Sequence, residues 1–161
     1  MGHRDIAFLA GPTNLSTSLL RLKTFKRTAA ELGAVPDDGL VECCEAYSEA
    51  AGEAALNRLR ATGRRFTAVL ASNDLIALGC YDALERHGLN CPGDISVIGF
   101  NDMPFIDKLR PPLTSVHVPH HEMGRTAARL LLTQIREGLP SRGSTVQLPA
   151  ELVVRGSPAA V

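Results

Sequence analysis

The stretch AVLASNDLIALGCYDALERHGLNCPGDISVIGFNDMPFIDKLRPPLTSV, residues 68–116, decides the fold of this chain. It opens with the short apolar run 68–71, a pattern typical of a strand that is buried on both faces. Apolar residues at helical spacing follow over 74–87, and a Pro-Gly turn then leads to a second apolar run at 95–100. Strand, helix and strand in this order predict a βαβ unit of a parallel sheet.

Both predicted strands end in a polar pair. Asn73 and Asp74 follow the first strand, and Asn101 and Asp102 follow the second. In open α/β sheets, ligands bind beyond the carboxyl ends of the strands. The two pairs are therefore expected to lie on one ligand-binding edge of the sheet.

The rest of the 161 residues continues the alternation of strands and helices. Before the central stretch we predict a strand at 6–10, a helix at 17–32 capped by Ser16 or Thr17, a strand at 39–43 and a helix from Ser48 to Gly63. After it we predict a strand at 115–118, a helix from Pro119 to Gly138, short strands at 145–148 and 152–154, and a frayed tail at 157–161. Together these elements predict an α/β fold with a doubly wound, mostly parallel sheet.

Composition argues against several classes of protein. Basic and acidic residues balance at 17 each, so no overall positive field is available to hold a nucleic-acid backbone. Cys43, Cys44, Cys80 and Cys91 form no C-x-x-C pair and are expected to be reduced and packed, as in a cytosolic protein. No apolar run approaches the ~18 residues of a membrane span, and the start of the chain lacks the apolar segment of a signal peptide.

Motifs of common enzyme classes are absent from the sequence. It contains no G-x-G, no G-K-[ST] and no G-x-S-x-G, so we expect neither catalytic residues nor a cofactor. A phosphoacceptor enzyme of flavodoxin-like topology would need an acidic cluster after the first strand, where residues 11–14 read GPTN. The run HVPHHE at 117–122 passes from strand to helix at Pro119, so its side chains diverge and no metal site is expected.

Several motifs carry a resemblance to a known family. LASNDLIALG, PGDISVIGFNDMP and PPLTSV occur in order with short spacings and resemble the effector-binding core of LacI/GalR (lac-repressor/gal-repressor) transcription regulators. GHRDIAFLAGP near the start, AYSEAAGEAAL in the first third and LPAELVVRGSP near the end are similar to further segments of that family. The resemblance covers essentially the whole chain.

The resemblance implies a fold and a domain organisation. The fold would be the periplasmic-binding-protein-like type I fold, with the flavodoxin-like strand order 2-1-3-4-5 and a partial second subdomain. Residues 1–117 would form the C-terminal effector-binding subdomain, 118–148 a helix and strand of the N-terminal subdomain, and 149–161 a return strand and tail. We expect the chain to be the C-terminal part of a regulator, without the helix-turn-helix head that binds DNA.

The same resemblance implies a set of ligand-binding residues. Arg21 matches a helix arginine that binds effector oxygens, and its fork of donors suits that role; the alternative is an exposed helix arginine. Tyr47 matches an aromatic residue that stacks on the effector; the alternative is a tyrosine that packs the turn. Asn73 is either a ligand contact or a plain N-cap.

The remaining site residues follow the second strand. Asn101 stands where many sugar-responsive members have aspartate, so it keeps one acceptor and loses the charge; this puts a simple sugar in question and admits a more anionic ligand. His120 matches a position that faces the effector cleft. Asp74 and Asp102 are expected to be structural, with Asp74 in the first helical turn near the positive end of the dipole and Asp102 ordering its loop.

A dimer interface is also implied by the resemblance. The residues expected at a two-fold seam are Leu75, Leu78, Tyr81, Phe105, Ile106 and Leu109; the alternative is that they pack only their own helix and loop. The helix at 119–137 has an apolar side that, without its own sheet, is expected to seek other contacts, including a second chain.

These observations favour one function and leave one alternative. The chain is expected to be the effector-sensing and dimerisation region of a LacI-type regulator, in which a small metabolite modulates operator affinity. Such a regulator would be cytoplasmic, homodimeric and not an enzyme, and would contact DNA only through its N-terminal head. The alternative is a periplasmic sugar-binding protein of the same fold.

Overall fold

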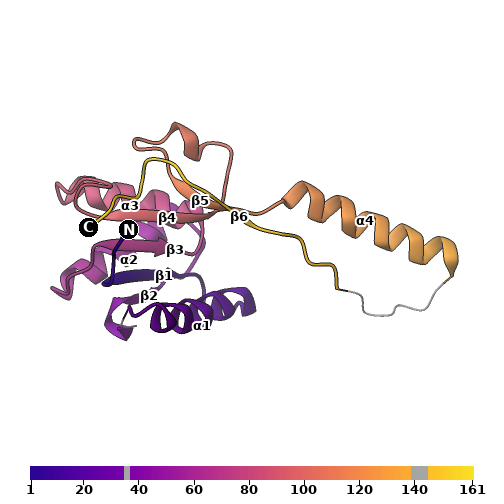
Figure 1. Ribbon diagram of the computed structural model, residues 1–161, viewed down its shortest axis with the longest axis horizontal. Coiled ribbons are helices and arrows are strands. Elements are labelled where there is room, and N and C mark those ends of the chain that lie inside the picture. Colours follow the sequence, from indigo (N-terminus) through magenta and orange to yellow (C-terminus); the bar gives the residue numbers. More distant parts are fainter. Residues whose placement is uncertain (35–36, 139–144) are drawn as a thin grey trace.

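The computed structural model describes residues 1–34, 37–138 and 145–161 (Figure 1). The strands are β1 (Ile6–Ala10), β2 (Val41–Cys43), β3 (Ala68–Ala71), β4 (Ser96–Asn101), β5 (Thr114–His117) and β6 (Glu151–Val153). The α-helices are α1 (Ser16–Glu31), α2 (Glu49–Ala61), α3 (Asp74–Arg86) and α4 (His120–Glu137), and short 3-10 helices lie at Asp38–Leu40 and Ile106–Lys108.

The strands form one sheet in the order β2-β1-β3-β4-β5-β6. β1 to β5 are parallel, and β6 pairs antiparallel with β5. This confirms the α/β fold, the mostly parallel sheet and the order 2-1-3-4-5, to which β6 adds an antiparallel edge strand. Because the strands are parallel, their carboxyl ends, and the loops that follow them, meet at one edge.

Helices cover the two faces of the sheet unequally. On one face, α2 and α3 close the main core, in which Leu9, Val97 and Leu56 are fully buried. Gly52 and Gly79 let these two helices approach closely, because a Cβ on either glycine would collide with backbone atoms of the other helix. On the opposite face, α1 packs against β1 through stacked rings of Phe8 and Phe25, 4.7 Å apart.

Most of the predicted helix boundaries are confirmed. Ser48 caps α2 by accepting a hydrogen bond from Ala51 N at 3.3 Å, and Gly88 follows α3 with a φ of +66°. The cap predicted for α1 is wrong: its N-cap is Leu15, an apolar residue that makes no side-chain cap. Pro119 is the N-cap of α4 rather than its first helical residue.

Two predictions for the end of the chain are wrong. Residues 145–148 form no strand, because no sheet strand lies beside them to pair with their backbone. The tail is not frayed: Ser157 is fully buried, and its hydroxyl donates to Val97 O at 2.6 Å and accepts from Thr114 N at 2.8 Å. Residues 139–144, part of the predicted helix end and connection, lie outside the described residues.

The four cysteines are free thiols that differ in exposure, and Cys91 is half-buried. Cys44 and Cys80 are buried, and burial raises the pKa of the Cys44 thiol to about 11. Cys43, however, is exposed, so the prediction that all four thiols are packed is wrong for this residue. As the last residue of β2, the outermost strand, it has no further strand to cover it.

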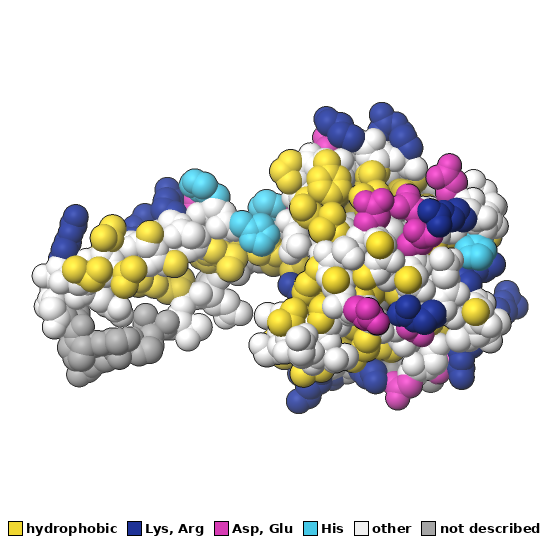
Figure 2. Space-filling view, turned by 180° about the vertical axis from the view of Figure 1, so that it is seen from behind, with side chains coloured by type: hydrophobic (Ala, Val, Ile, Leu, Met, Phe, Trp, Pro, Cys, Tyr) yellow, Lys and Arg dark blue, Asp and Glu magenta, His cyan; other side chains and the backbone are white. Residues whose placement is uncertain are grey.

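The helix α4 projects away from the rest of the molecule (Figure 1). We call residues 118–138 the α4 arm, and the other described residues up to 117 and from 151 the body. No residue of α4 is buried, and apolar side chains line the projecting helix in Figure 2. Among the described residues, no helix combines the length and apolar composition needed to cross a lipid bilayer.

Candidate functional site

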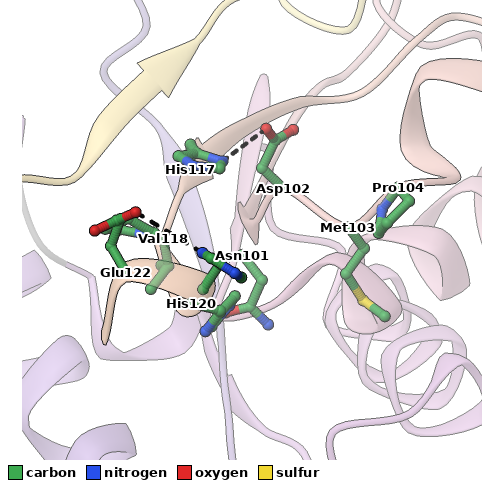
Figure 3. A pocket seen from close by; sticks show the side chains of 10 residues that line it. Asn101, Asp102, Met103, Pro104, His117, Val118, His120 and Glu122 are labelled. Atoms are coloured by element: carbon green, nitrogen blue, oxygen red, sulfur yellow. Dashed lines mark hydrogen bonds and ion pairs between the residues drawn. The ribbon is translucent and has the colours of Figure 1, made fainter. Parts of the chain in front are cut away.

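The predicted ligand edge lies at the carboxyl ends of β3, β4 and β5. Asn101 closes β4, and His117 closes β5 beside it, as the pairing of these two residues shows. A hollow of about 540 Å³ opens here, a volume within the range of small-molecule sites (Figure 3). Two segments line it: Asn101–Pro104 after β4, and His117–Glu122 where β5 passes into α4. The hollow therefore brings together Asn101 and His120, two of the predicted ligand residues.

Asn101 and Asp102, which line the hollow, have an unusual backbone conformation. Asn101 has a φ of +114° and Asp102 a φ of +58°, the left-handed region that non-glycine residues rarely adopt. Among the described residues these are the two non-glycine positions with positive φ. Strained backbone of this kind persists only where surrounding contacts hold it, and it clusters at functional sites.

Arg21 reaches the same edge from α1. Its Nη1 donates to the backbone oxygen of Ser72 at 2.8 Å, and its guanidinium lies 4.0 Å from the ring centroid of Phe100. The side chain is thus fixed between the ends of β3 and β4 by a hydrogen bond and a cation–π contact. Arg21 is half-buried rather than an exposed helix arginine.

Two buried hydroxyls near the carboxyl ends of β1 and β3 lack a hydrogen-bond partner among the described residues. The Tyr47 ring lies so close to Gly11, after β1, that a Cβ there would collide with it. Tyr47 Oη and Ser72 Oγ are both sealed from solvent and unpaired among the described residues. Leaving a buried polar group unpaired costs about 1–3 kcal/mol, so such atoms call for a partner, whether ligand or water.

Asn73 acts as the N-cap of α3. Its Oδ1 accepts from Ile76 N at 2.8 Å, and the residue is 5% exposed. The cap occupies the amide oxygen and leaves the NH₂ group, so any contact with a ligand would be as a donor.

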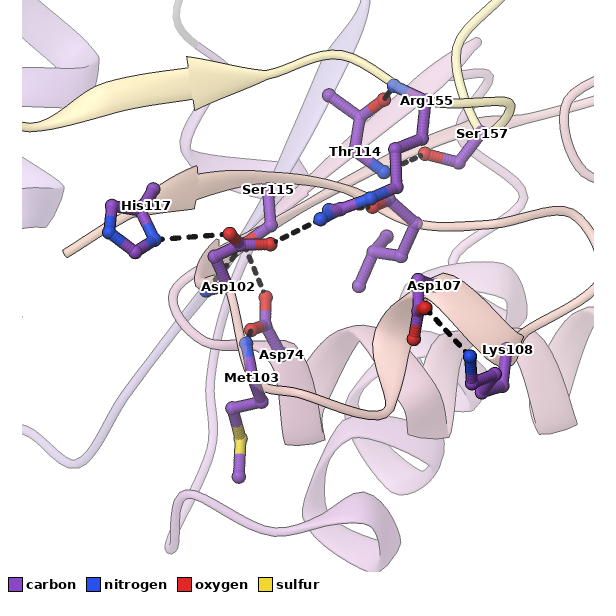
Figure 4. Close-up of polar contacts among 11 residues, drawn as sticks. Asp74, Asp102, Met103, Asp107, Lys108, Thr114, Ser115, His117, Arg155 and Ser157 are labelled. Atoms are coloured by element: carbon purple, nitrogen blue, oxygen red, sulfur yellow. Dashed lines mark hydrogen bonds and ion pairs between the residues drawn. The ribbon is translucent and has the colours of Figure 1, made fainter. Parts of the chain in front are cut away.

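The two aspartates of the edge belong to a polar cluster inside the body (Figure 4). Asp74 is fully buried; its carboxylate accepts from Ser115 Oγ at 2.6 Å and from Met103 N at 2.8 Å. Burial raises the pKa of the Asp74 carboxyl, although these hydrogen bonds oppose the shift. A Cβ on Gly99 would collide with this carboxylate, so the glycine makes room for it.

Asp102 is held from two sides. Arg155 Nη2, beyond β6, donates to its Oδ1 at 2.7 Å, and His117 Nδ1, at the end of β5, lies 3.1 Å from its Oδ2. Asp102 N also donates to Ser115 Oγ at 3.1 Å. These contacts bind the loop after β4 to the two strands that lead to and from the α4 arm.

Some residues of the site were not found from the sequence. Ser72, Phe100, His117 and Arg155 all contact the predicted residues, yet none was proposed for a role. Arg155 is the partly detectable case, because it stands in the LVVRGS segment that carries the resemblance. Among the described residues, no group of three or more His, Cys, Asp or Glu is placed to hold a metal ion.

The residues predicted for a dimer seam lie on α3 and the loop that contains the second 3-10 helix. Tyr81, Phe105 and Leu109 are partly buried against the core, and Tyr81 Oη donates to Pro111 O at 3.1 Å. Leu75 and Leu78 are half-buried. Ile106 is fully buried, so it packs its own loop and is not available to a partner.

The doubly wound sheet, its polar carboxyl edge and the hollow beside that edge define an α/β domain of the open-sheet class. The chain belongs to the periplasmic binding protein-like domain family, whose model matches residues 1–158. Within that family, it corresponds to the C-terminal part of LacI-type transcription regulators.

Individual relatives support this placement. The transcriptional regulator MalR of Streptomyces coelicolor is 38% identical over 162 residues, which cover 99% of this chain and 46% of MalR. The structure of a complex of the regulator CelR with cellobiose matches 97% of this chain and 47% of CelR, with a TM-score of 0.90 and 32% identity. That of the lac repressor dimer bound to operator and the anti-inducer ONPF matches 99% of this chain and 54% of the repressor, with a TM-score of 0.88 and 31% identity. The chain thus spans about half the length of these relatives.

Proposed function

We propose that this chain is the effector-sensing and dimerisation region of a LacI-type transcription regulator. The observation that carries the proposal is the group of polar side chains at one sheet edge with hydrogen-bonding capacity to spare. Arg21 is fixed on Phe100, and the buried hydroxyls of Tyr47 and Ser72 have no partner among the residues that the structure describes. Asn101 opens the adjacent hollow, which His120 also lines.

The proposed mechanism links this edge to the α4 arm. A ligand would bind between the edge and a second subdomain, to which residues 118–148 would contribute. It would shift the closure equilibrium by no more than its difference in affinity for the two states. In the whole protein, acting in the cytoplasm, this closure would change the affinity for operator DNA. CelR with cellobiose and the lac repressor dimer on its operator are relatives that support such a role.

The effector proposal is tested by titration of the ¹⁵N-labelled chain with a panel of sugars and nucleosides. Because this edge is one wall of the proposed cleft, we expect weak binding, with a dissociation constant of about a millimolar. Arg21→Ala should abolish the chemical-shift changes at the edge, whereas Lys23→Ala, an exposed cation on the same helix, should leave them unchanged. Equal loss in both variants would contradict a specific role for Arg21.

We also propose that the chain forms a homodimer through α3 and the loop at 105–109. The half-buried Leu75 and Leu78, with Tyr81, Phe105 and Leu109, supply apolar side chains on these two segments. Leu78→Glu should weaken self-association measured by light scattering, whereas Glu85→Lys, an exposed change on the same helix, should not. A wild-type chain that stays monomeric at tens of micromolar would refute the dimer.

A further inference from the structure

We propose that the effector carries an anionic oxygen group, a carboxylate or a phosphate, that binds beside Arg21 at the first turn of α1. This inference rests on the proposed function and names the chemical class of its ligand. It depends on three features of the described residues: a cation without a counter-ion, a helix start without a cap and a buried hydroxyl without a partner.

Arg21 has no carboxylate partner among the described residues. Its hydrogen bond goes to the neutral backbone oxygen of Ser72, and its plane rests on Phe100. A guanidinium has five N–H donors, so several remain for a ligand. A half-buried arginine with spare donors is suited to bind a carboxylate or phosphate through two parallel hydrogen bonds.

The carboxylates near this edge are engaged elsewhere or exposed. Both oxygens of Asp102 and both of Asp74 accept hydrogen bonds within the cluster of Figure 4. Glu122 is paired with Arg125 at 2.6 Å on the α4 arm. Glu45, on the loop after β2, is exposed. Arg21 therefore contributes a positive charge to the edge that Asp74, Asp102 and Glu122 do not neutralise.

The start of α1 differs from the starts of the two neighbouring helices. Ser48 caps α2 and Asn73 caps α3, and each helix has an acidic residue in its first turn. The N-cap of α1 is Leu15, which makes no side-chain hydrogen bond, and its first turn has no acidic residue. Ser18 N already donates to Leu15 O at 3.1 Å, so within the described part of the chain the N–H groups of Ser16 and Thr17 and the positive dipole end of α1 are left for another acceptor. An anion suits both.

Ser72 places an unpaired hydroxyl on the same side of the sheet as α1. The residue is 2% exposed, and its Oγ has no hydrogen-bond partner in the described part of the chain. Val69 and Ala71 face the core under α2 and α3, and Ser72 N continues the ladder by donating to Leu9 O at 2.9 Å. Because side chains alternate along a strand, Ser72 points to the opposite face, where Arg21 binds its carbonyl.

The rest of the ligand would extend toward the hollow. Phe100, under Arg21, is followed directly by Asn101, which lines the hollow together with His120. A ligand with an anionic group at Arg21 and hydroxyl groups at Asn101 would be a sugar acid or a sugar phosphate.

The test compares gluconate, glucose 6-phosphate, inorganic phosphate and glucose by NMR titration at constant ionic strength. We expect the three anions to shift the amides of residues 16–18 and 72, and the two sugar anions to bind about tenfold more tightly than glucose. Arg21→Gln should remove that preference, whereas Arg21→Lys should keep part of it. Glu45→Gln is the control and should leave the preference in place.

Ser72→Ala separates a binding role from a structural one. Because the hydroxyl has no partner among residues 1–34, 37–138 and 145–161, its removal should not lower the melting temperature, yet it should weaken anion binding several-fold. If glucose binds as tightly as gluconate, the proposal that the effector carries an anionic group is refuted, while the proposed function still stands. Anions that produce no saturable shift at residues 16–18 and 72 would also refute the anionic proposal. If the full sugar and nucleoside panel fails at this edge as well, the proposed function falls too.

Discussion

The body and the α4 arm both contain helices with an apolar side, but they differ in what covers that side. In the body, α2 and α3 bury Leu56 and Ile76 completely between helix and sheet. In the arm, α4 is longer, yet no residue of it is buried, and Leu131 and Ile135 are 58% and 66% exposed. An apolar stripe therefore forms a helix in both regions, but it contributes to a core only where a second layer meets it.

Polar side chains show the same contrast. Asp74 in the body is fully buried and accepts two hydrogen bonds, so its carboxylate is tied to the fold. Glu122 in the arm pairs with Arg125 one turn away in partly exposed surroundings, where such pairs contribute about 0–1 kcal/mol. This pair lies within α4, so it stabilises the helix slightly and does not tie the arm to the body.

The largest expected difference is between a buried leucine of the body and an exposed leucine of α4. Leu56→Ala, in the core of the body, should lower the free energy of unfolding by about 2–5 kcal/mol, because it removes packed atoms and leaves a cavity. Leu131→Ala, at a 58% exposed position of α4, should change it by less than about 0.5 kcal/mol. Urea denaturation at micromolar protein measures both. If the two variants lose similar free energies of unfolding, α4 is packed in solution, and the body and the arm do not differ in packing.

The second prediction concerns the buried carboxylate. Asp74→Ala should cost about 1–3 kcal/mol, because Met103 N and Ser115 Oγ would lose their acceptor. Asp74→Asn should cost less, because the amide can accept from Met103 N and donate to Ser115 Oγ. Glu122→Gln in the arm is the matched change and should have an effect below about 0.5 kcal/mol.

The contribution of Asp74 to the free energy of unfolding is expected to depend on pH. Because burial raises the pKa of Asp74, the folded state holds its proton to higher pH than the unfolded state. The contribution of Asp74 to stability should therefore fall as pH rises from the ordinary aspartate value, about 3.9, through the raised folded value. Asp74→Asn should remove this part of the pH profile, and a profile identical to wild type would contradict the raised pKa.

The third prediction concerns association through the arm. If the apolar side of α4 enters an interface between two copies, replacing Leu131 and Ile135 together by serine should raise the dimer dissociation constant about tenfold or more. Replacing Arg129 and Arg136 by serine, on the same exposed helix, is the control. Light scattering across a concentration series measures both pairs. Unchanged association in the Leu131 and Ile135 variant would confine the dimer to α3 and the loop at 105–109.

The smallest effect is expected from the salt bridges at the surface of the body. Arg58 and Glu42 pair at 2.8 Å across β2 and α2, with half of the arginine side chain exposed. Arg58→Ala should cost at most about 1 kcal/mol, and salt should reduce that difference further. A larger loss that persists in 0.5 M salt would show that this pair behaves as a buried one.

The sequence by itself determined most of the elements and the edge at which the candidate site lies. Apolar runs and helical spacing identify β3, α3 and β4 and the order in which they alternate, and Asn73 and Gly88 are visible as start and stop signals of α3. These features are local, because each depends on residues within one or two turns. Because the strands are parallel, the same reading places Asn73 and Asn101 on one edge.

Only the tertiary structure decided which side chains meet at that edge and which face is left uncovered. Arg155 and Asp102 are 53 residues apart, and Arg21 and Ser72 are 51 apart, so no spacing in the sequence marks either pair. The sequence also gives no sign of the missing cap at Leu15, the unpaired Ser72 hydroxyl or the position of α4. A local pattern shows only what a residue could contact. Which contacts form depends on the packing of distant segments, and that packing exists only in the folded chain.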